Sequence, residues 1–381
     1  MDTQPLNGLV IADFSRVLAG PLVTQTLAGL GARVIKVERP GTGDDTRSWG
    51  PPFQGNLATY FTSVNRGKES IALDLKDPED LVIACRLAES ADVLVENFRP
   101  GLMHEFGLGY ESLASANPKL VYCSISAFGD QGEGAELPGV DLLVQAMAGW
   151  MHVTGQVDGP PTKVGMAVVD VVAGLYATTG VLAALFQRAG NGGLGQRVHV
   201  SLYEAALSGL INLASGHLLT GDDPHRNGNR HPSIAPYELF HAADRPFVLA
   251  AVNDSLFVRT CHVIGRPELS VDPRFDTNPR RRANVEALVV ELEEAFRSRL
   301  ASDWIDLLRA ERVPVGDVNT VAEAFELADQ LGLDVVSEDP SKGARGLRLP
   351  IQLSDSGPVP LAVSPDLDRD GDSIRDWLEQ Q

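Results

Sequence analysis

The sequence predicts an α/β protein built around a parallel β-sheet. Short apolar segments rich in Val and Ile alternate with helix-like segments through residues 1–130, and turn residues separate them. Strands that alternate with helices in this way form parallel sheets that are covered on both faces.

The first strand–helix–strand unit covers residues 9–37. We predict a strand at 9–14 (LVIADF), a break at Gly20-Pro21, a helix at 22–30 and a second strand at 33–37 (RVIKV). This unit is Rossmann-like, and an acidic residue follows its second strand. The first turn, FSRVLAGP, lacks the G-x-G-x-x-G pattern, so binding of a nicotinamide cofactor is not expected.

The same alternation continues along the chain. Residues 70–75 (SIALDL) are a predicted strand, and the following Asp77-Pro78 provides the cap and the first-turn proline of a helix. Residues 92–98 (DVLVENF) and 120–125 (LVYCSI) add two further apolar strands. These segments complete the predicted parallel sheet.

The second half of the chain is organised differently. A long apolar helix is predicted over 195–219, followed by a loop at 223–236 that is rich in Asn, Gly, His and Pro. A strand at 247–252 then precedes three helical patterns, and residues 347–353 are again strand-like.

These changes of pattern predict two domains. We expect a large α/β domain at residues 1–220, completed by about 331–381, and a smaller α/β domain at 225–330.

Composition excludes several classes of protein. The chain has 381 residues, with 32 Lys and Arg against 51 Asp and Glu, so its formal charge is −19. Nucleic acids and anionic membranes require a positive surface, so neither is an expected partner. Cys85, Cys123 and Cys261 have no redox or metal-ligand spacing, and no metal site is expected. The N-terminal segment does not have the pattern of a signal peptide, and we expect a cytoplasmic protein.

One acidic residue stands out from its surroundings. Residues 166–186 (MAVVDVVAGLYATTGVLAALF) are a mostly apolar run with one acidic residue, Asp170. The segment is long enough to span a membrane, although its flanks are typical of a globular protein. Asp170 could instead cap a core helix as a structural residue. In the third interpretation it is a nucleophile in a dry site, held ionised by the backbone N–H groups and dipole of a helix N-terminus.

Several segments, taken together and in order, resemble the class III CoA-transferase family, which also contains the α-methylacyl-CoA racemases. The matching segments are GLVIADFSRVLAGP (8–21), GARVIKVERPGTGDDTR (31–47), NRGKESIALDL (65–75), ADVLVENFRPG (91–101), NPKLVYCSISAFG (117–129) and GPPTKVGMAVVDVVAGLYATTGVLAAL (159–185). The shared order over nearly the whole chain makes the resemblance specific.

The resemblance implies an interlocked-ring homodimer and an acyl-accepting nucleophile at Asp170. It implies that acyl-CoA and a small carboxylic acid are substrates, with no permanently bound cofactor. It places Gly228 and Asn229 in a loop that closes over the acyl group. The implied CoA contacts are Val17, Leu18, Ala19, Arg39, Leu73, Asp74, Leu75, Lys76, Asn97, Phe98 and Arg99.

Two alternatives stay open beside the transferase. In racemases of this family a His precedes the Asp that aligns with Asp141, whereas this chain has Val140, which cannot carry a proton. The later carboxylate of the racemases falls near Tyr237, with Glu238 one position away. A non-catalytic acyl-CoA-binding protein is the third possibility, because Glu105 and Leu137 stand where the family usually has cations.

Overall fold

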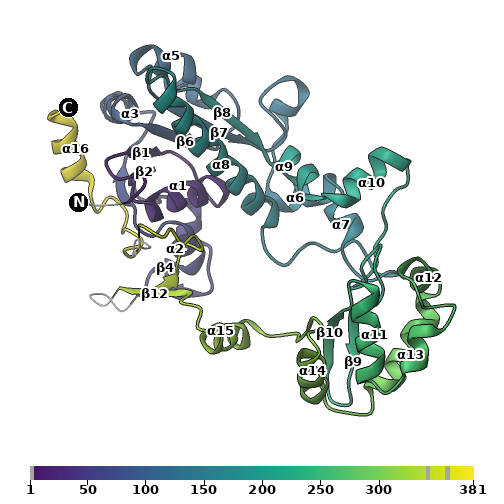
Figure 1. The fold of residues 1–381 in the computed structure, drawn as a ribbon. Helices are drawn as coiled ribbons and strands as arrows, with labels where there is room; N and C mark the ends of the chain where they lie inside the picture. The colour runs from purple at the N-terminus through teal and green to yellow at the C-terminus, as the bar shows by residue number, and fades with distance from the viewer. Residues whose placement is uncertain (1–3, 340–343, 357–360) are drawn as a thin grey trace. The chain divides into compact units, whose positions relative to one another are not determined.

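The computed structural model describes residues 4–339, 344–356 and 361–381, which form two compact units (Figure 1). The first unit contains Met1–Trp150, Lys163–Asp222 and Asp334–Gln381, and the second contains Met151–Thr162 and Asp223–Leu333. Residues 151–162, which we assigned to the large domain, pack with the second unit instead.

A six-stranded parallel sheet forms the centre of the first unit. Its strand order is β5-β2-β1-β6-β7-β8, and every neighbouring pair is parallel. The strands are β1 (Val10–Asp13), β2 (Arg33–Glu38), β5 (Glu69–Ala72), β6 (Val93–Glu96), β7 (Val121–Ser126) and β8 (Arg197–Ser201). The predicted α/β fold with a parallel sheet is therefore confirmed.

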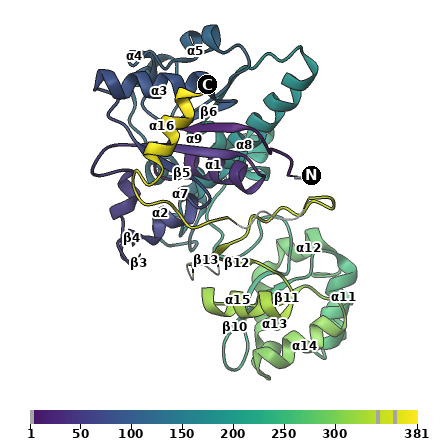
Figure 2. The same cartoon turned by 90° about the vertical axis from the view of Figure 1, so that its left-hand side faces the viewer.

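Helices cover both faces of this sheet. One face carries α1 (Ala19–Gly29), α6 (Asp141–Met147), α8 (Val168–Gly190) and α9 (Leu202–Gly209). The other face carries α3 (Pro78–Ser90), α4 (Leu102–Glu105), α5 (Tyr110–Ala116) and the C-terminal α16 (Gly371–Glu379), which is yellow in Figure 2. Helices α1 and α8 approach closely at Gly174, where a Cβ would lie 3.0 Å from the carbonyl oxygen of Ala19.

The predicted helix over residues 195–219 is wrong. Residues 197–201 (RVHVS) form β8, which pairs with β7 at the edge of the sheet. Ser201 then caps α9, because its hydroxyl accepts a hydrogen bond from the Glu204 N–H. A second short helix, α10 (Asn212–Thr220), follows. The predicted strand at 347–353 is also wrong in its extent, because β13 (Ala344–Leu347) ends where we expected the strand to begin.

Helix α8 contains the apolar run that carries Asp170. Among the described residues it is the one helix long and apolar enough to cross a membrane. Its inner face, which includes Val169, Ala173, Ala177 and Val181, is fully buried in the core of the first unit. That burial is typical of a core helix.

The second unit has an antiparallel sheet of β9 (Tyr237–His241), β10 (Pro246–Ala250) and β11 (Val315–Asp317). Its helices are α11 (Asp254–Val263), α12 (Asn278–Ala283), α13 (Val285–Phe296), α14 (Ala301–Ala310) and α15 (Val321–Gln330). In its core the Phe296 ring packs edge to face against Phe247 and Trp304 and at a tilt against Phe240. The remaining α-helices and strands of the described residues are β3 (Phe53–Gln54), β4 (Leu57–Ala58), α2 (Thr59–Val64), α7 (Trp150–Val153) and β12 (Val336–Asp339).

Candidate active site

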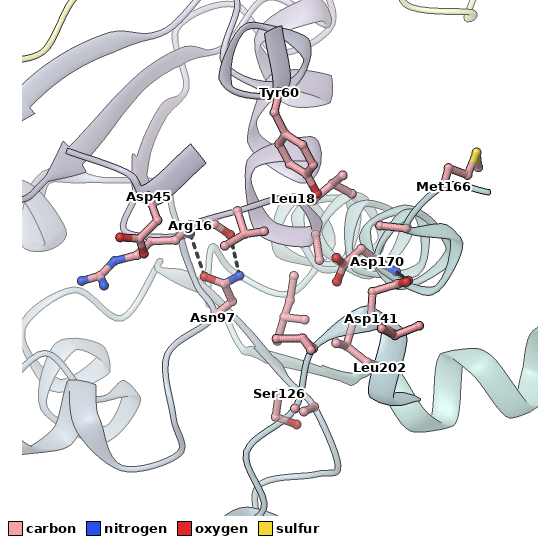
Figure 3. A pocket seen from close by; sticks show the side chains of 18 of the residues that line it. Arg16, Leu18, Asp45, Tyr60, Asn97, Ser126, Asp141, Met166, Asp170 and Leu202 are labelled. Atoms are coloured by element: carbon pink, nitrogen blue, oxygen red, sulfur yellow. Dashed lines mark hydrogen bonds between the residues drawn. The ribbon is translucent and has the colours of Figure 1, made fainter. Parts of the chain in front are cut away.

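A cavity of about 650 Å³ lies in the first unit, where the carboxyl ends of β1, β6 and β7 meet. The loops that follow these strands line it, together with α2 and the first turns of α6 and α8. Ligands of open parallel sheets bind at this edge. Asp170 lies in the wall of the cavity, beside Asp141 and opposite Leu18 (Figure 3).

Helix α6 fixes the segment that leads into α8. The Asp141 carboxylate accepts hydrogen bonds from the N–H groups of Val169 (2.8 Å) and Asp170 (3.3 Å). The buried Gln145 side chain donates to the other oxygen of Asp141 at 2.6 Å and accepts from the Val164 N–H at 2.9 Å. Asp141 therefore caps α8, and the structural role that we considered for Asp170 belongs to its neighbour.

The Asp170 carboxylate has no hydrogen-bond donor among the residues that the structure describes. Burial raises its pKa, and the negative charge of Asp141 raises it further, to about 7. Our expectation that backbone N–H groups hold this carboxylate ionised is wrong, because Asp141 accepts those hydrogen bonds. Near neutral pH the carboxylate can therefore lose or bind a proton, and its oxygens face the cavity without a partner.

Tyr60 and Lys163 also line the cavity, and the sequence analysis missed both. The pKa of Tyr60 is raised to about 12 by burial and by the charges of Asp170 and Asp141, so its hydroxyl stays protonated. Its ring packs edge to face on Trp49, with 5.6 Å between ring centroids. No local motif marks these residues, because they reach the cavity through tertiary contacts.

The structure brings together six of the eleven predicted CoA-contacting residues. The residues that line the cavity are Val17, Leu18, Ala19, Asn97, Phe98 and Arg99. The others follow β2 or β5 at the same edge of the sheet but do not line the cavity, namely Arg39, Leu73, Asp74, Leu75 and Lys76. Leu73 is buried in the core, and Arg39 forms an ion pair with Asp45.

The two positions that depart from the family pattern lie beside this region. Glu105 accepts hydrogen bonds from Arg99 at 2.7 and 2.8 Å, so it replaces an expected cation and also engages a neighbouring one. Leu137 lines an adjoining cavity of about 420 Å³ together with Asn97 and Phe98. Both departures reduce the positive charge beside the cavity.

Gly228 and Asn229 belong to the second unit. The Gly228 N–H donates to the Gly155 carbonyl at 3.0 Å, and its positive φ of 61° suits glycine. Two residues later, Arg230 forms an ion pair with Glu238 at 3.0 Å. Among the described residues, no group of three His, Cys, Asp or Glu side chains is placed to hold a metal ion.

Comparison with known proteins identifies the family. The sequence profile of CoA-transferase family III matches residues 6–371. The chain is 43% identical to acetyl-CoA:oxalate CoA-transferase of Acetobacter aceti, over 97% of this chain and 95% of the relative. It is 40% identical to succinate–glutarate CoA-transferase of Agrobacterium fabrum, over 95% and 88% of the two chains. A crystal structure of a CAIB/BAIF family protein from Brucella suis superposes with a TM-score of 0.88 at 41% identity, covering 98% of this chain and 99% of that one. The chain therefore belongs to CoA-transferase family III and is a class III CoA-transferase that uses acyl-CoA as a substrate.

Proposed function

We propose that Asp170 is the nucleophile of this enzyme and carries first the acyl group and then CoA. The observation that supports this role most directly is an unpartnered carboxylate in the wall of a largely apolar cavity. A carboxylate that is shielded from water is a competent nucleophile toward an activated acyl carbon.

The proposed reaction passes through two kinds of aspartyl intermediate. An Asp170 oxygen attacks the thioester carbon of the donor and expels CoA thiolate, which forms a mixed anhydride. The thiolate attacks the aspartyl carbon and expels the donor acid, which leaves an aspartyl-CoA thioester. The acceptor carboxylate then attacks this thioester and regenerates an anhydride and free thiolate. The thiolate finally attacks the acceptor acyl carbon, so acyl-CoA is released and the Asp170 carboxylate is restored.

The cavity suits reactive acyl intermediates. Met166, Ala167 and Leu202 line it together with Leu18 and Ile125, and these apolar side chains limit access of water to the anhydride. Each step exchanges one activated acyl group for another, so no external energy source is required. A serine nucleophile would form an ester, which is a much poorer acyl donor.

We assign a dicarboxylic acid as acceptor. The two relatives reported above are named for oxalate and for succinate and glutarate, which are all dicarboxylates. The cavity of this chain is also lined by three cationic side chains, Arg16, Arg99 and Lys163, of which Arg99 is paired with Glu105. A cation in the cavity can pair with the carboxylate that does not react. Monocarboxylic acids such as formate and acetate are therefore expected to be poorer acceptors than succinate or glutarate.

The residues at the two positions that a racemase would use disfavour racemisation. Val140 occupies the position of the racemase His, and Glu238 is engaged by Arg230. A non-catalytic acyl-CoA-binding protein would bind donor but form no covalent adduct. Exchange of the α-proton with deuterium in the absence of acceptor would favour a racemase, and tight donor binding without an adduct would favour the binding protein.

We further propose that the enzyme is a soluble, cytoplasmic homodimer whose chains interlock. Large apolar side chains are strongly exposed on the single chain, including Phe186 on α8 (85%) and Leu218 and Leu219 on α10 (83% and 85%). Exposed apolar surface of this kind is typical of an interface. Light scattering after size-exclusion chromatography tests the dimer, and a monomer at micromolar concentration would contradict it.

Intact-protein mass spectrometry tests the nucleophile. The protein is mixed with succinyl-CoA or acetyl-CoA and then treated with hydroxylamine, which traps an aspartyl thioester or anhydride as a hydroxamate. We expect a hydroxamate at Asp170 in the wild type and none in Asp170→Ala, with a loss of at least about 1000-fold in turnover. Asp306→Ala, which removes an exposed carboxylate on α14, is the matched control. Wild-type turnover in Asp170→Ala would exclude this mechanism.

A further inference from the structure

Side chains hold the backbone of the loop that joins β1 to α1. The Ser15 N–H donates to the Asp13 carboxylate at 3.0 Å, and the Ser15 carbonyl accepts from the Lys36 ammonium at 2.8 Å. Both Asp13 and Lys36 are completely buried. The start of the loop is thus fixed by the last residue of β1 and by Lys36 of β2.

Asn97 holds the next residue through both ends of its carboxamide. Its Oδ1 accepts from the Arg16 N–H at 2.8 Å, and its Nδ2 donates to the Arg16 carbonyl at 2.8 Å (Figure 3). Because both polar atoms of the side chain bind protein backbone, this geometry differs from the direct CoA contact that the family resemblance implies for Asn97.

Asp44 binds the backbone of a third residue of the loop, Val17. Its carboxylate accepts from the Val17 N–H at 3.3 Å and forms a buried ion pair with Lys36 at 3.0 Å. The backbone polar groups from Ser15 N to Val17 N are therefore all bonded to side chains of other elements.

Val17 has a φ of +66°, in the left-handed region. This conformation is unfavourable for a β-branched residue and persists only where the surroundings impose it. The turn is also tight, because a Cβ at Gly20 would lie 2.2 Å from the Ser15 Cβ. The strain occurs directly beside the cavity, whose wall Leu18 and Ala19 share with Asp170.

We propose that Asn97 and Asp44 are positioning residues that hold Val17 in its strained conformation and thereby place Leu18 and Ala19 against Asp170. The proposal rests on the role proposed for Asp170. It assigns the carboxamide of Asn97 to the loop backbone instead of to CoA.

Four variants test the assignment: Asn97→Ala, Val17→Gly, the double variant and Asn117→Ala. Asn117 is a matched control, because its carboxamide also bonds backbone on both sides, to the Ala91 carbonyl and the Lys119 N–H, but it does not line the cavity. We expect Asn97→Ala to lower kcat about 30- to 100-fold. The KM for acyl-CoA and the Kd for free CoA, measured by calorimetry, should change less than about threefold, because binding contacts persist. Asn117→Ala should retain wild-type kinetics.

The double variant gives the sharpest outcome. Glycine adopts the left-handed conformation without steric cost, so Val17→Gly should return at least about fivefold of the kcat that Asn97→Ala loses. Failure of this rescue would overturn the proposal. So would a Kd for CoA that rises tenfold in Asn97→Ala while kcat is retained, since the carboxamide would then bind CoA.

Amide hydrogen exchange tests the role of Asn97 independently of the proposed function of Asp170. Without any substrate, amides of residues 15–19 should exchange faster in Asn97→Ala than in the wild type or Asn117→Ala. If the wild type transfers no CoA but this difference is present, the nucleophile assignment fails and the loop assignment holds. Equal exchange in all three proteins would overturn the loop assignment, whatever the activity.

Discussion

Asp13 and Asp170 are two carboxylates of one unit that face opposite electrostatic environments. Asp13, at the end of β1, is fully buried and lies 2.9 Å from the Lys68 ammonium, with hydroxyls of Ser15 and Thr24 also donating to it. Burial opposes its charge, but Lys68 and Lys36 hold its pKa at about 2. Asp170 has Asp141 as its charged neighbour, and its pKa rises to about 7.

The difference shows that burial alone does not decide the charge of a carboxylate. A carboxylate that is paired with cations stays ionised, and its oxygens are occupied by ion pairs and hydrogen bonds, which suits a structural role. An uncompensated carboxylate in a dry wall is destabilised as an anion, which suits attack on an acyl carbon. The predictions below test the two carboxylates against each other.

The largest effect is expected from Asp13→Asn. This change leaves Lys68 without its buried ion-pair partner and leaves Lys36 with Asp44 as its remaining paired carboxylate, and it should lower the free energy of unfolding by about 3–5 kcal/mol. The stabilisation by Asp13 is present above the unfolded pKa of its carboxyl and is lost as pH falls through about 2. Urea unfolding at pH 7 measures the effect.

A double variant serves as the control for that loss. Asp13→Leu combined with Lys68→Met removes the ion pair as a unit and should be less destabilised than Asp13→Asn alone. If Asp13→Asn unfolds at the wild-type urea concentration, the charges around Asp13 are not coupled as described.

Asp170→Asn should act in the opposite direction on stability. The folded-state pKa of Asp170 is raised, so its ionisation destabilises the fold as pH rises from about 4 to about 7. Removing the charge should raise the free energy of unfolding by about 2–3 kcal/mol at pH 8, after allowance for solvent at the cavity mouth. The gain should disappear near pH 4, where the wild-type carboxyl is protonated in both states. A gain that does not depend on pH would contradict this explanation.

Activity should follow the ionisation of Asp170. Its anion is the proposed nucleophile, so kcat/KM should fall about tenfold per pH unit well below pH 7 and level off above it. Initial rates between pH 5.5 and 8.5, at fixed ionic strength and with subsaturating acyl-CoA, measure this profile. A flat profile across that range would mean that the nucleophile titrates elsewhere.

The sequence predicted the parts of this site that depend on local pattern. Asp170 can be identified as a candidate because it is the one acid in a mostly apolar run. The strands that end at the cavity can be predicted from their Val and Ile content. The capping of α8 by Asp141 is not visible, because it joins residues 28 positions apart in sequence. The conformation of Val17 is hidden for the same reason, since its imposing partners lie far along the chain and valine alone favours extended structure. The edge strand β8 lies inside the segment for which the sequence predicts a helix, because its pairing with β7 is non-local.

The smallest effect is expected from Asp141→Asn, which isolates the part of the Asp170 pKa shift that comes from a neighbouring charge. The asparagine Oδ1 can still accept from the Val169 and Asp170 N–H groups, so the cap on α8 is retained. The asparagine Nδ2 replaces the oxygen that accepts from Gln145, so that one hydrogen bond is lost. Since burial is the larger cause and stays unchanged, the apparent pKa of kcat/KM should fall by only about half a unit to one unit. The fall in kcat/KM between pH 7 and pH 6 should then be smaller than in the wild type. Hydroxylamine trapping at pH 6 offers a second measurement, because a larger ionised fraction of Asp170 gives a faster first acyl transfer. An apparent pKa equal to that of the wild type would mean that burial alone raises the pKa of Asp170 and that the role of Asp141 is confined to the cap.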